Sequence, residues 1–131
     1  MRKILVILLS VLIANSLLTA CGSSSKTDAP AKAVEDYLNA LVAKDADRLP
    51  TLVCGKWEEE ALVELDSFQA VTARLEEVAC KQSGTDGTTT LVSCTGNIVT
   101  TYNNEDSKID LSTIVYEVTQ ENGDWLVCGT R

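Results

Sequence analysis

Residues 80–94 read CKQSGTDGTTTLVSC, and this stretch decides how the second half of the chain folds. The segment TDGT at 85–88 is typical of a tight hairpin turn, because Asp-Gly accepts the positive φ angles that such turns require. If the turn centres on Gly87, positions equally far from it face each other, and Cys80 lies opposite Cys94. Opposed residues of an antiparallel pair have Cβ atoms about 4.5–5.5 Å apart, so slight closure reaches disulfide geometry.

A strand pattern follows this turn. Residues 91–102 are rich in Val, Ile, Thr and Tyr, and alternate positions form one apolar face. That face consists of Val92, Cys94, Ile98 and Tyr102. The segment NNED at 103–106 predicts the next turn.

Two further strands are predicted at 109–120 and 125–130, and the Asn122-Gly123 pair between them is a strong hairpin signal. In the first of these strands apolar residues occupy both odd and even positions. One phase cannot bury both sets, so we expect a β-bulge near 112–114.

The segment 68–83 fits two structures. Leu75, Val78 and Ala79 suit a helix, whereas Val71, Ala73 and Leu75 alternate as in a strand. A long strand at 91–102 needs a partner across the turn, so we favour a strand from about 72 to 83.

Helical patterns fill the first part of the domain. Apolar residues at i, i+3, i+4 and i+7 predict an amphipathic helix over 31–44. A short second helix opens at Asp45, and a third begins at Trp57 and stops near 66–67. The predicted fold class is therefore α+β, with N-terminal helices packed on a curved four-stranded antiparallel meander sheet.

The domain holds four cysteines, which are Cys54, Cys80, Cys94 and Cys128, and the chain has no histidine. If the domain is exported, an even number of cysteines predicts two disulfides. Pairing Cys80 with Cys94 leaves Cys54 for Cys128, although four cysteines allow three connectivities. A zinc site is the competing interpretation, but it needs short paired spacings that the chain lacks, so we expect no metal and no cofactor.

The first 20 residues have the parts of a secretory signal: Arg2-Lys3, an apolar run and a small-residue ending. Residues 18–21 read LTAC and resemble the lipobox of bacterial lipoproteins, in which the cysteine is lipidated. An ordinary signal with an accidental cysteine is the alternative. We expect a signal peptide at 1–20, lipidated Cys21 with a flexible tether at 21–30, and one domain at 31–131. The tether reaches at most about 30 Å.

Without Arg2 and Lys3 the chain carries 9 basic and 19 acidic residues. No basic cluster remains, so nucleic acid is not an expected partner. The expected location is extracytoplasmic, on the cell membrane or outer membrane. The expected partners are the membrane, through the lipid on Cys21, and an apolar small molecule or an envelope protein.

The order of elements resembles the nuclear transport factor 2-like superfamily, whose members form a cone from a curved sheet wrapped around helices. The stretches DSF at 66–68, CTGNI at 94–98, TY at 101–102, IDLS at 109–112 and GDWLVCG at 123–129 look like lipoproteins of this kind without assigned activity. The resemblance covers 31–131 and implies the fold more than any chemistry. The chain lacks the early extra hairpin of many members, which puts a full cone in doubt.

Two function classes follow. The favoured one is a non-catalytic binding or interaction module, because histidine is absent and the apolar face of 91–102 carries no carboxylate. The alternative is an isomerase- or dehydratase-like enzyme in a cone pocket, which a buried carboxylate beside Tyr102 or Tyr116 would favour. Aromatic residues are the candidates for lining a ligand pocket, although they also suit the core: Trp57, Phe68, Tyr102 and Tyr116.

Overall fold

The computed structural model of the chain describes residues 29–131. The predicted signal at 1–20, the lipidation site Cys21 and the tether up to residue 28 lie outside the described residues. The last two tether positions, 29 and 30, instead begin the first helix. Within 29–131 there is no helix with the length and apolar character needed to span a membrane.

Helix α1 (Ala29–Ala43) is the predicted amphipathic helix, and it begins two residues earlier than expected. Its stripe of Val34, Tyr37, Leu38 and Leu41 is completely buried. Lys44 follows the end of the helix, and its positive φ of 57° allows the amides of residues 44 and 45 to donate hydrogen bonds to the carbonyls of Leu41 and Ala40. This arrangement is a Schellman motif.

Two further helical segments follow. The expected short helix is the 3₁₀ helix η1 (Leu49–Leu52), with Pro50 in its first turn, where no amide hydrogen is needed. Helix α2 (Glu58–Ser67) agrees with the third predicted helix to within one residue at its start. Three glutamates stand in its first turn, where the helix dipole favours negative charge.

The sheet has five strands instead of the expected four. They are β1 (Thr72–Asp86), β2 (Thr89–Tyr102), β3 (Glu105–Asp110), β4 (Val115–Glu121) and β5 (Asp124–Thr130). All pairings are antiparallel, in the order β1-β2-β4-β5, and β3 also pairs with β2. The fold class, α+β with helices on an antiparallel sheet, is confirmed.

The strand expected at 109–120 divides into β3 and β4. A 3₁₀ turn, η2 (Leu111–Thr113), separates them, and Asp110 caps it by accepting a hydrogen bond from the amide of Ser112 at 2.9 Å. A complete turn, instead of the expected bulge, therefore changes the phase of the apolar residues. The two strands pair with different parts of β2: β3 with residues 97–102 and β4 with residues 90–93.

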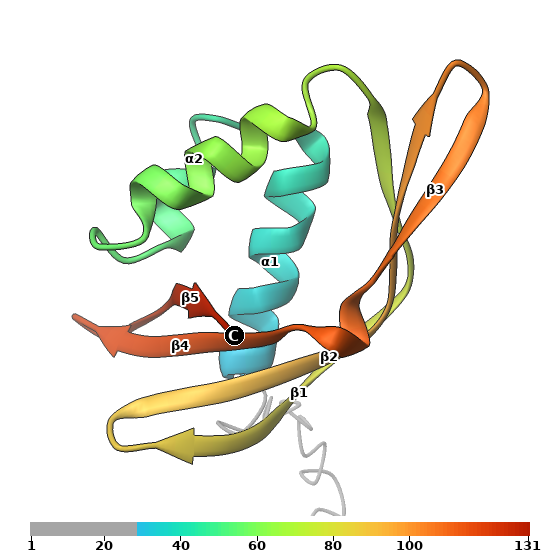
Figure 1. Cartoon of the computed structure of the whole chain (residues 1–131). Helices are drawn as coiled ribbons and strands as arrows, with labels where there is room; N and C mark the ends of the chain where they lie inside the picture. Colours follow the sequence, from blue (N-terminus) through green and yellow to red (C-terminus); the bar gives the residue numbers. More distant parts are fainter. Residues whose placement is uncertain (1–28) are drawn as a thin grey trace, which may run out of the picture.

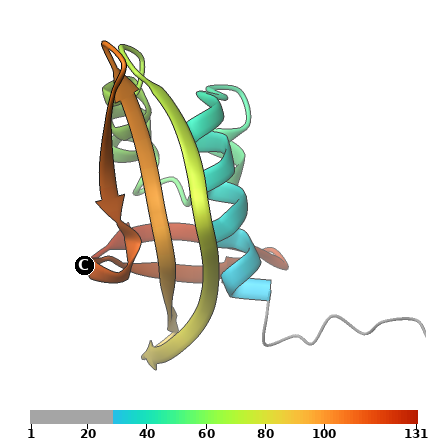
Figure 2. The same cartoon turned by 90° about the vertical axis from the view of Figure 1, so that its right-hand side faces the viewer.

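The β1–β2 hairpin places Cys80 opposite Cys94, as expected, but its turn centres between Gly87 and Thr88. An irregularity at Ser83 shifts the register by one residue and restores the predicted cysteine pairing. A second bulge faces Gly96, where a Cβ would lie 2.5 Å from the carbonyl oxygen of Glu77. Such bulges bend and twist the strands, and Figure 2 shows β1 and β2 as long curved ribbons.

The helical layer lies on one face of this curved sheet. Helix α1 packs against β1, β2, β4 and β5, and α2 lies beyond it (Figure 1). The core fills the space between α1 and the sheet, with fully buried Leu41, Leu111, Val118 and Val127 among its members. Two disulfides close the domain: Cys80–Cys94 within the hairpin and Cys54–Cys128 between the helical layer and β5.

Candidate functional site

A cavity of about 450 Å³ lies between α2 and the part of the sheet where η2, β4 and the end of β5 meet. Helix α2 forms one wall, and the start of β4 and the chain end form the other. Pockets for small ligands have volumes of about 300–1,000 Å³, so the size suits a small molecule. The lining residues are Trp57, Glu60, Val63, Glu64, Thr113, Ile114, Tyr116, Thr130 and Arg131.

The position of α2 over this cavity is fixed at its start. Cys54 is joined to Cys128 of β5, and its amide donates a hydrogen bond to the carbonyl oxygen of Val127 at 3.0 Å. The amide of Trp57 then donates to the carbonyl oxygen of Cys54 at 2.9 Å, which turns the chain into the helix. Trp57, Glu60 and Glu64 follow at helical spacing and therefore share the face that lines the cavity.

Two tyrosines and a glutamate meet at the inner side of the cavity. The hydroxyl of Tyr37 in α1 donates a 2.5 Å hydrogen bond to Oε2 of Glu64. The rings of Tyr37 and Tyr116 meet edge to face, with centroids 6.3 Å apart. Tyr37 is completely buried and Tyr116 is 2% exposed, while Glu64 is half-buried. The site thus places a carboxylate against aromatic side chains at the edge of the core.

The environment shifts the protonation equilibria of these groups. Burial raises the pKa of Glu64 above its usual value, and the hydrogen bond from Tyr37 acts in the opposite direction. Burial also raises the pKa of Tyr37 and that of Tyr116 far above their usual value, and the charge of Glu64 adds to both shifts. Both phenols are therefore neutral hydrogen-bond donors at physiological pH.

The indole of Trp57 contributes a polar atom without a partner. Its Nε1 is buried and makes no hydrogen bond within the described chain. The side chain of Trp57 lowers the pKa of the Tyr37 phenol, against the larger effects of burial and Glu64, which raise it. Since buried polar groups are nearly always paired, this enclosed N–H is an exception, and the cavity does not expose it.

Charge around the cavity is unbalanced. Arg131 lines it, but its guanidinium is paired with Glu117 at 2.7 Å and with Asp86 at 3.2 Å. Across residues 29–131, none of the salt bridges involves Glu60 or Glu64. The α2 wall therefore presents carboxylates without a protein cation.

The structure brings together two of the four aromatic residues expected at a pocket. Trp57 and Tyr116 line the cavity. Phe68 is 5% exposed and belongs to the core, because it follows the last turn of α2 and packs inward. Tyr102 is 60% exposed at the end of β2, where the sheet extends beyond the helices, so neither Phe68 nor Tyr102 lines this cavity.

Sequence reasoning did not identify Tyr37 and Glu64 as site residues. Tyr37 stands in the apolar stripe of its helix and has the pattern of a core residue. The position of Glu64 could have been predicted from the sequence. It stands seven residues after Trp57, which is two helical turns, and therefore lies on the same face of the helix. Its pairing with Tyr37 depends on how α1 and α2 cross, which periodicity does not specify.

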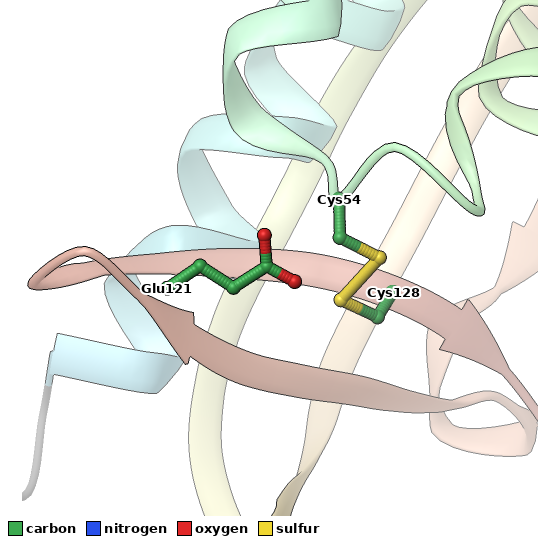
Figure 3. Close-up of side chains that lie close together, drawn as sticks. All are labelled: Cys54, Glu121 and Cys128. Atoms are coloured by element: carbon green, nitrogen blue, oxygen red, sulfur yellow. A yellow bond between two sulfur atoms is a disulfide. The ribbon is translucent and has the colours of Figure 1, made fainter.

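Figure 3 shows the Cys54–Cys128 disulfide, and the side chain of Glu121 extends toward it. The sulfur and oxygen atoms of these three residues lie within 4.8 Å of one another. Metal binding by cysteine requires free thiolates, and here the two sulfurs are bonded to each other. The group therefore lacks the ligands of a metal centre while the disulfide is intact.

No protein-family model matches the sequence, and no curated protein matches it. Among solved structures, the chain is similar to the solution structure of a SEC-C motif containing protein from Rhodopseudomonas palustris. The TM-score is 0.53 with 10% sequence identity, over 82% of this chain and 80% of the other. The likeness concerns the fold alone: the SEC-C motif protein shares the arrangement of helices and sheet with this chain.

Proposed function

We propose that this protein is a lipid-anchored extracytoplasmic lipoprotein whose domain binds a small molecule in the cavity beneath α2. The observation that carries the proposal is the cavity itself, which has the size of a ligand site and joins apolar walls to a few convergent polar groups. These polar groups are the carboxylates of Glu60 and Glu64 and the phenol of Tyr116.

Export and anchoring rest on the sequence at 1–21, with its charged start, apolar run and lipobox-like LTAC. We further propose that the domain belongs to the nuclear transport factor 2-like superfamily. The curved course of β1 and β2 past α1 (Figure 2) supports this assignment, and so does the presence of a cavity between α2 and the sheet. In this proposal the domain acts by binding and not by catalysis.

A second candidate is a small-molecule enzyme, and one observation favours it. Glu64 is a half-buried carboxylate beside Tyr116, the arrangement that a proton-transferring site requires. Two features speak for binding instead. Glu64 already accepts a short hydrogen bond from Tyr37, which weakens it as a base, and the chain has no histidine as a second acid-base group.

The binding proposal can be tested by calorimetric titration of the full chain in a neutral detergent, with empty micelles as the blank. Three probes of similar size share a phenyl ring and carry a positive, a neutral or a negative polar group: 2-phenylethylamine, 2-phenylethanol and phenylacetate. We expect at least one of them to bind saturably with one site per chain. The absence of binding by all three would overturn the proposal.

A pair of neighbouring substitutions shows whether binding occurs in the cavity. Thr113→Trp introduces a large ring at the cavity wall and should abolish binding. Ser112→Trp adds the same ring one residue earlier, at an exposed position outside the cavity lining, and should leave binding unchanged. Equal binding by both variants would place the site elsewhere.

The enzyme candidate has its own test. Turnover assays on enolisable ketones and simple esters should give no rate above buffer if the domain only binds. A saturable rate that disappears in Glu64→Gln, with the fold retained, would instead establish catalysis and reject the binding module.

A further inference from the structure

The chemistry of the cavity walls restricts the charge of the ligand. Glu60 and Glu64 stand one helical turn apart on the face of α2 that lines the cavity, and the rings of Trp57 and Tyr116 form neighbouring parts of the wall. Carboxylates next to aromatic faces are the groups that proteins use to hold organic ammonium ions, through charge-assisted hydrogen bonds and cation–π contact.

Glu64 also lacks the partner that a carboxylate in its position needs. It is half-buried and accepts one hydrogen bond, from the neutral phenol of Tyr37. Removing a carboxylate from water is costly unless a cation and further hydrogen bonds compensate. The cation that lines the cavity, Arg131, is directed to Glu117 and Asp86 instead.

We infer that the ligand of this cavity carries a protonated amine, which donates a hydrogen bond to Glu64 and rests against the rings of Trp57 and Tyr116. The inference rests on the proposed binding function and names the class of its ligand. The remainder of the ligand is small, because the cavity has a volume of about 450 Å³. It meets a mixed wall, in which apolar Val63 and Ile114 stand beside the hydroxyl-bearing side chains of Thr113 and Thr130.

Other ligand charges fit the walls less well. An anion would meet the unpaired carboxylates of Glu60 and Glu64, and a neutral molecule would leave Glu64 desolvated without a cation. A bare metal ion would need at least three converging ligand atoms. The group of that kind found in the described residues is Cys54, Glu121 and Cys128, which does not include the α2 glutamates.

The three probes introduced above separate these cases. We expect 2-phenylethylamine to bind about tenfold or more tightly than 2-phenylethanol, the ratio that one charge-assisted hydrogen bond provides. Phenylacetate should bind more weakly than the alcohol. Glu64→Gln should remove the advantage of the amine and leave binding of the alcohol unchanged.

Glu59→Gln is the matched control, because Glu59 has the same charge on the same helix but lines no part of this cavity. It should retain the preference for the amine, and unfolding curves of both variants should show intact folds. Equal or tighter binding of the alcohol or of phenylacetate would overturn the inference while leaving the binding function in place. Binding of calcium chloride alone at Glu64, in competition with the amine, would overturn it in favour of a metal site.

Discussion

At the scale of single residues, Glu64 is the group whose environment matters most. Its carboxylate sits at the edge of the core, and its hydrogen-bond donor is Tyr37, a phenol that burial keeps neutral. A neutral donor compensates for part of the lost hydration only. The folded protein therefore favours the protonated form of Glu64 more than the unfolded chain does, which is the meaning of its raised pKa.

The sign of the effect on stability follows from this shift. When the pKa of a carboxyl group is higher in the folded state, the shift adds to the free energy of unfolding. This contribution is complete below the pKa of the unfolded chain, which is about 4.3 for glutamate. That contribution is lost as the pH rises through the folded pKa. Gln cannot ionise but can still accept the hydrogen bond from Tyr37, so we expect Glu64→Gln to be more stable than the natural protein at pH 7. Urea unfolding from pH 4 to pH 8 should show the difference growing with pH.

Glu59→Gln again provides the comparison, because Glu59 is exposed and stands five residues earlier on α2, away from the face that lines the cavity. Its unfolding free energy should not exceed that of the natural protein at any pH in the range. At pH 7 it should be lower by about 0.3–1 kcal/mol, because the substitution removes a first-turn charge that the helix dipole favours. If Glu64→Gln were less stable than the natural protein at pH 7, the carboxylate would have a stabilising partner that the Tyr37 contact does not explain.

At the scale of elements, the local chemistry of turns was predictable from the sequence. Asn122 and Gly123 both adopt positive φ, 52° and 94°, in the hairpin between β4 and β5. Such angles are intrinsic preferences of these residues and need no tertiary contact.

Features that depend on how strands pair and how helices cross were less predictable from the sequence. The conflict of phases in 109–120 was visible, but whether a bulge or a complete turn resolves it depends on how both halves meet β2. The hairpin register was correct at Cys80 only because the irregularity at Ser83 offsets the displaced turn centre. Of the aromatic residues named as pocket candidates, Trp57 and Tyr116 line the cavity. The contact between Glu64 and Tyr37 instead depends on the crossing of two helices.

The two disulfides join elements in different ways, and their removal should have different effects. Cys80–Cys94 has a sequence separation of 14 and crosses one hairpin, while Cys54–Cys128 has a separation of 74 and ties the start of α2 to β5. On the chain-entropy model the shorter link contributes about 3 kcal/mol and the longer about 4.5 kcal/mol. Replacing Cys54 and Cys128 together by Ala should therefore cost at least as much stability as replacing the hairpin pair, as measured by urea unfolding.

Peptide mapping of the non-reduced protein should recover both links as the structure has them. The double replacement at Cys54 and Cys128 should also weaken probe binding in the cavity, because it frees the start of the helix that carries Trp57. The hairpin replacement is the control and should retain binding. Recovery of Cys54 linked to Cys80 would contradict the hairpin register.

At the scale of the whole molecule, the entry point of the chain and the cavity lie at different places. The described chain begins at the start of α1, and α2 lies toward the other end of that helix (Figure 1). A lipid on Cys21 would thus be connected to the domain at the start of α1, which is the end of that helix farther from α2. The tether is short, so the domain would stay within about 30 Å of the bilayer.

The anchoring proposal makes a prediction that is independent of the fold. When the full chain is produced in a bacterial host, it should incorporate labelled fatty acid and partition into detergent. Two or three acyl chains are needed for durable membrane attachment, because each buried CH₂ contributes about 0.8 kcal/mol and a single chain binds only marginally.

Cys21→Ser should abolish labelling, since the acyl chains are attached through the thiol that this substitution removes. The disulfide map of the variant should remain unchanged, because Cys21 lies outside the described domain and its four cysteines. Labelling that persists in Cys21→Ser would place the lipid elsewhere and remove the support for a lipobox at 18–21.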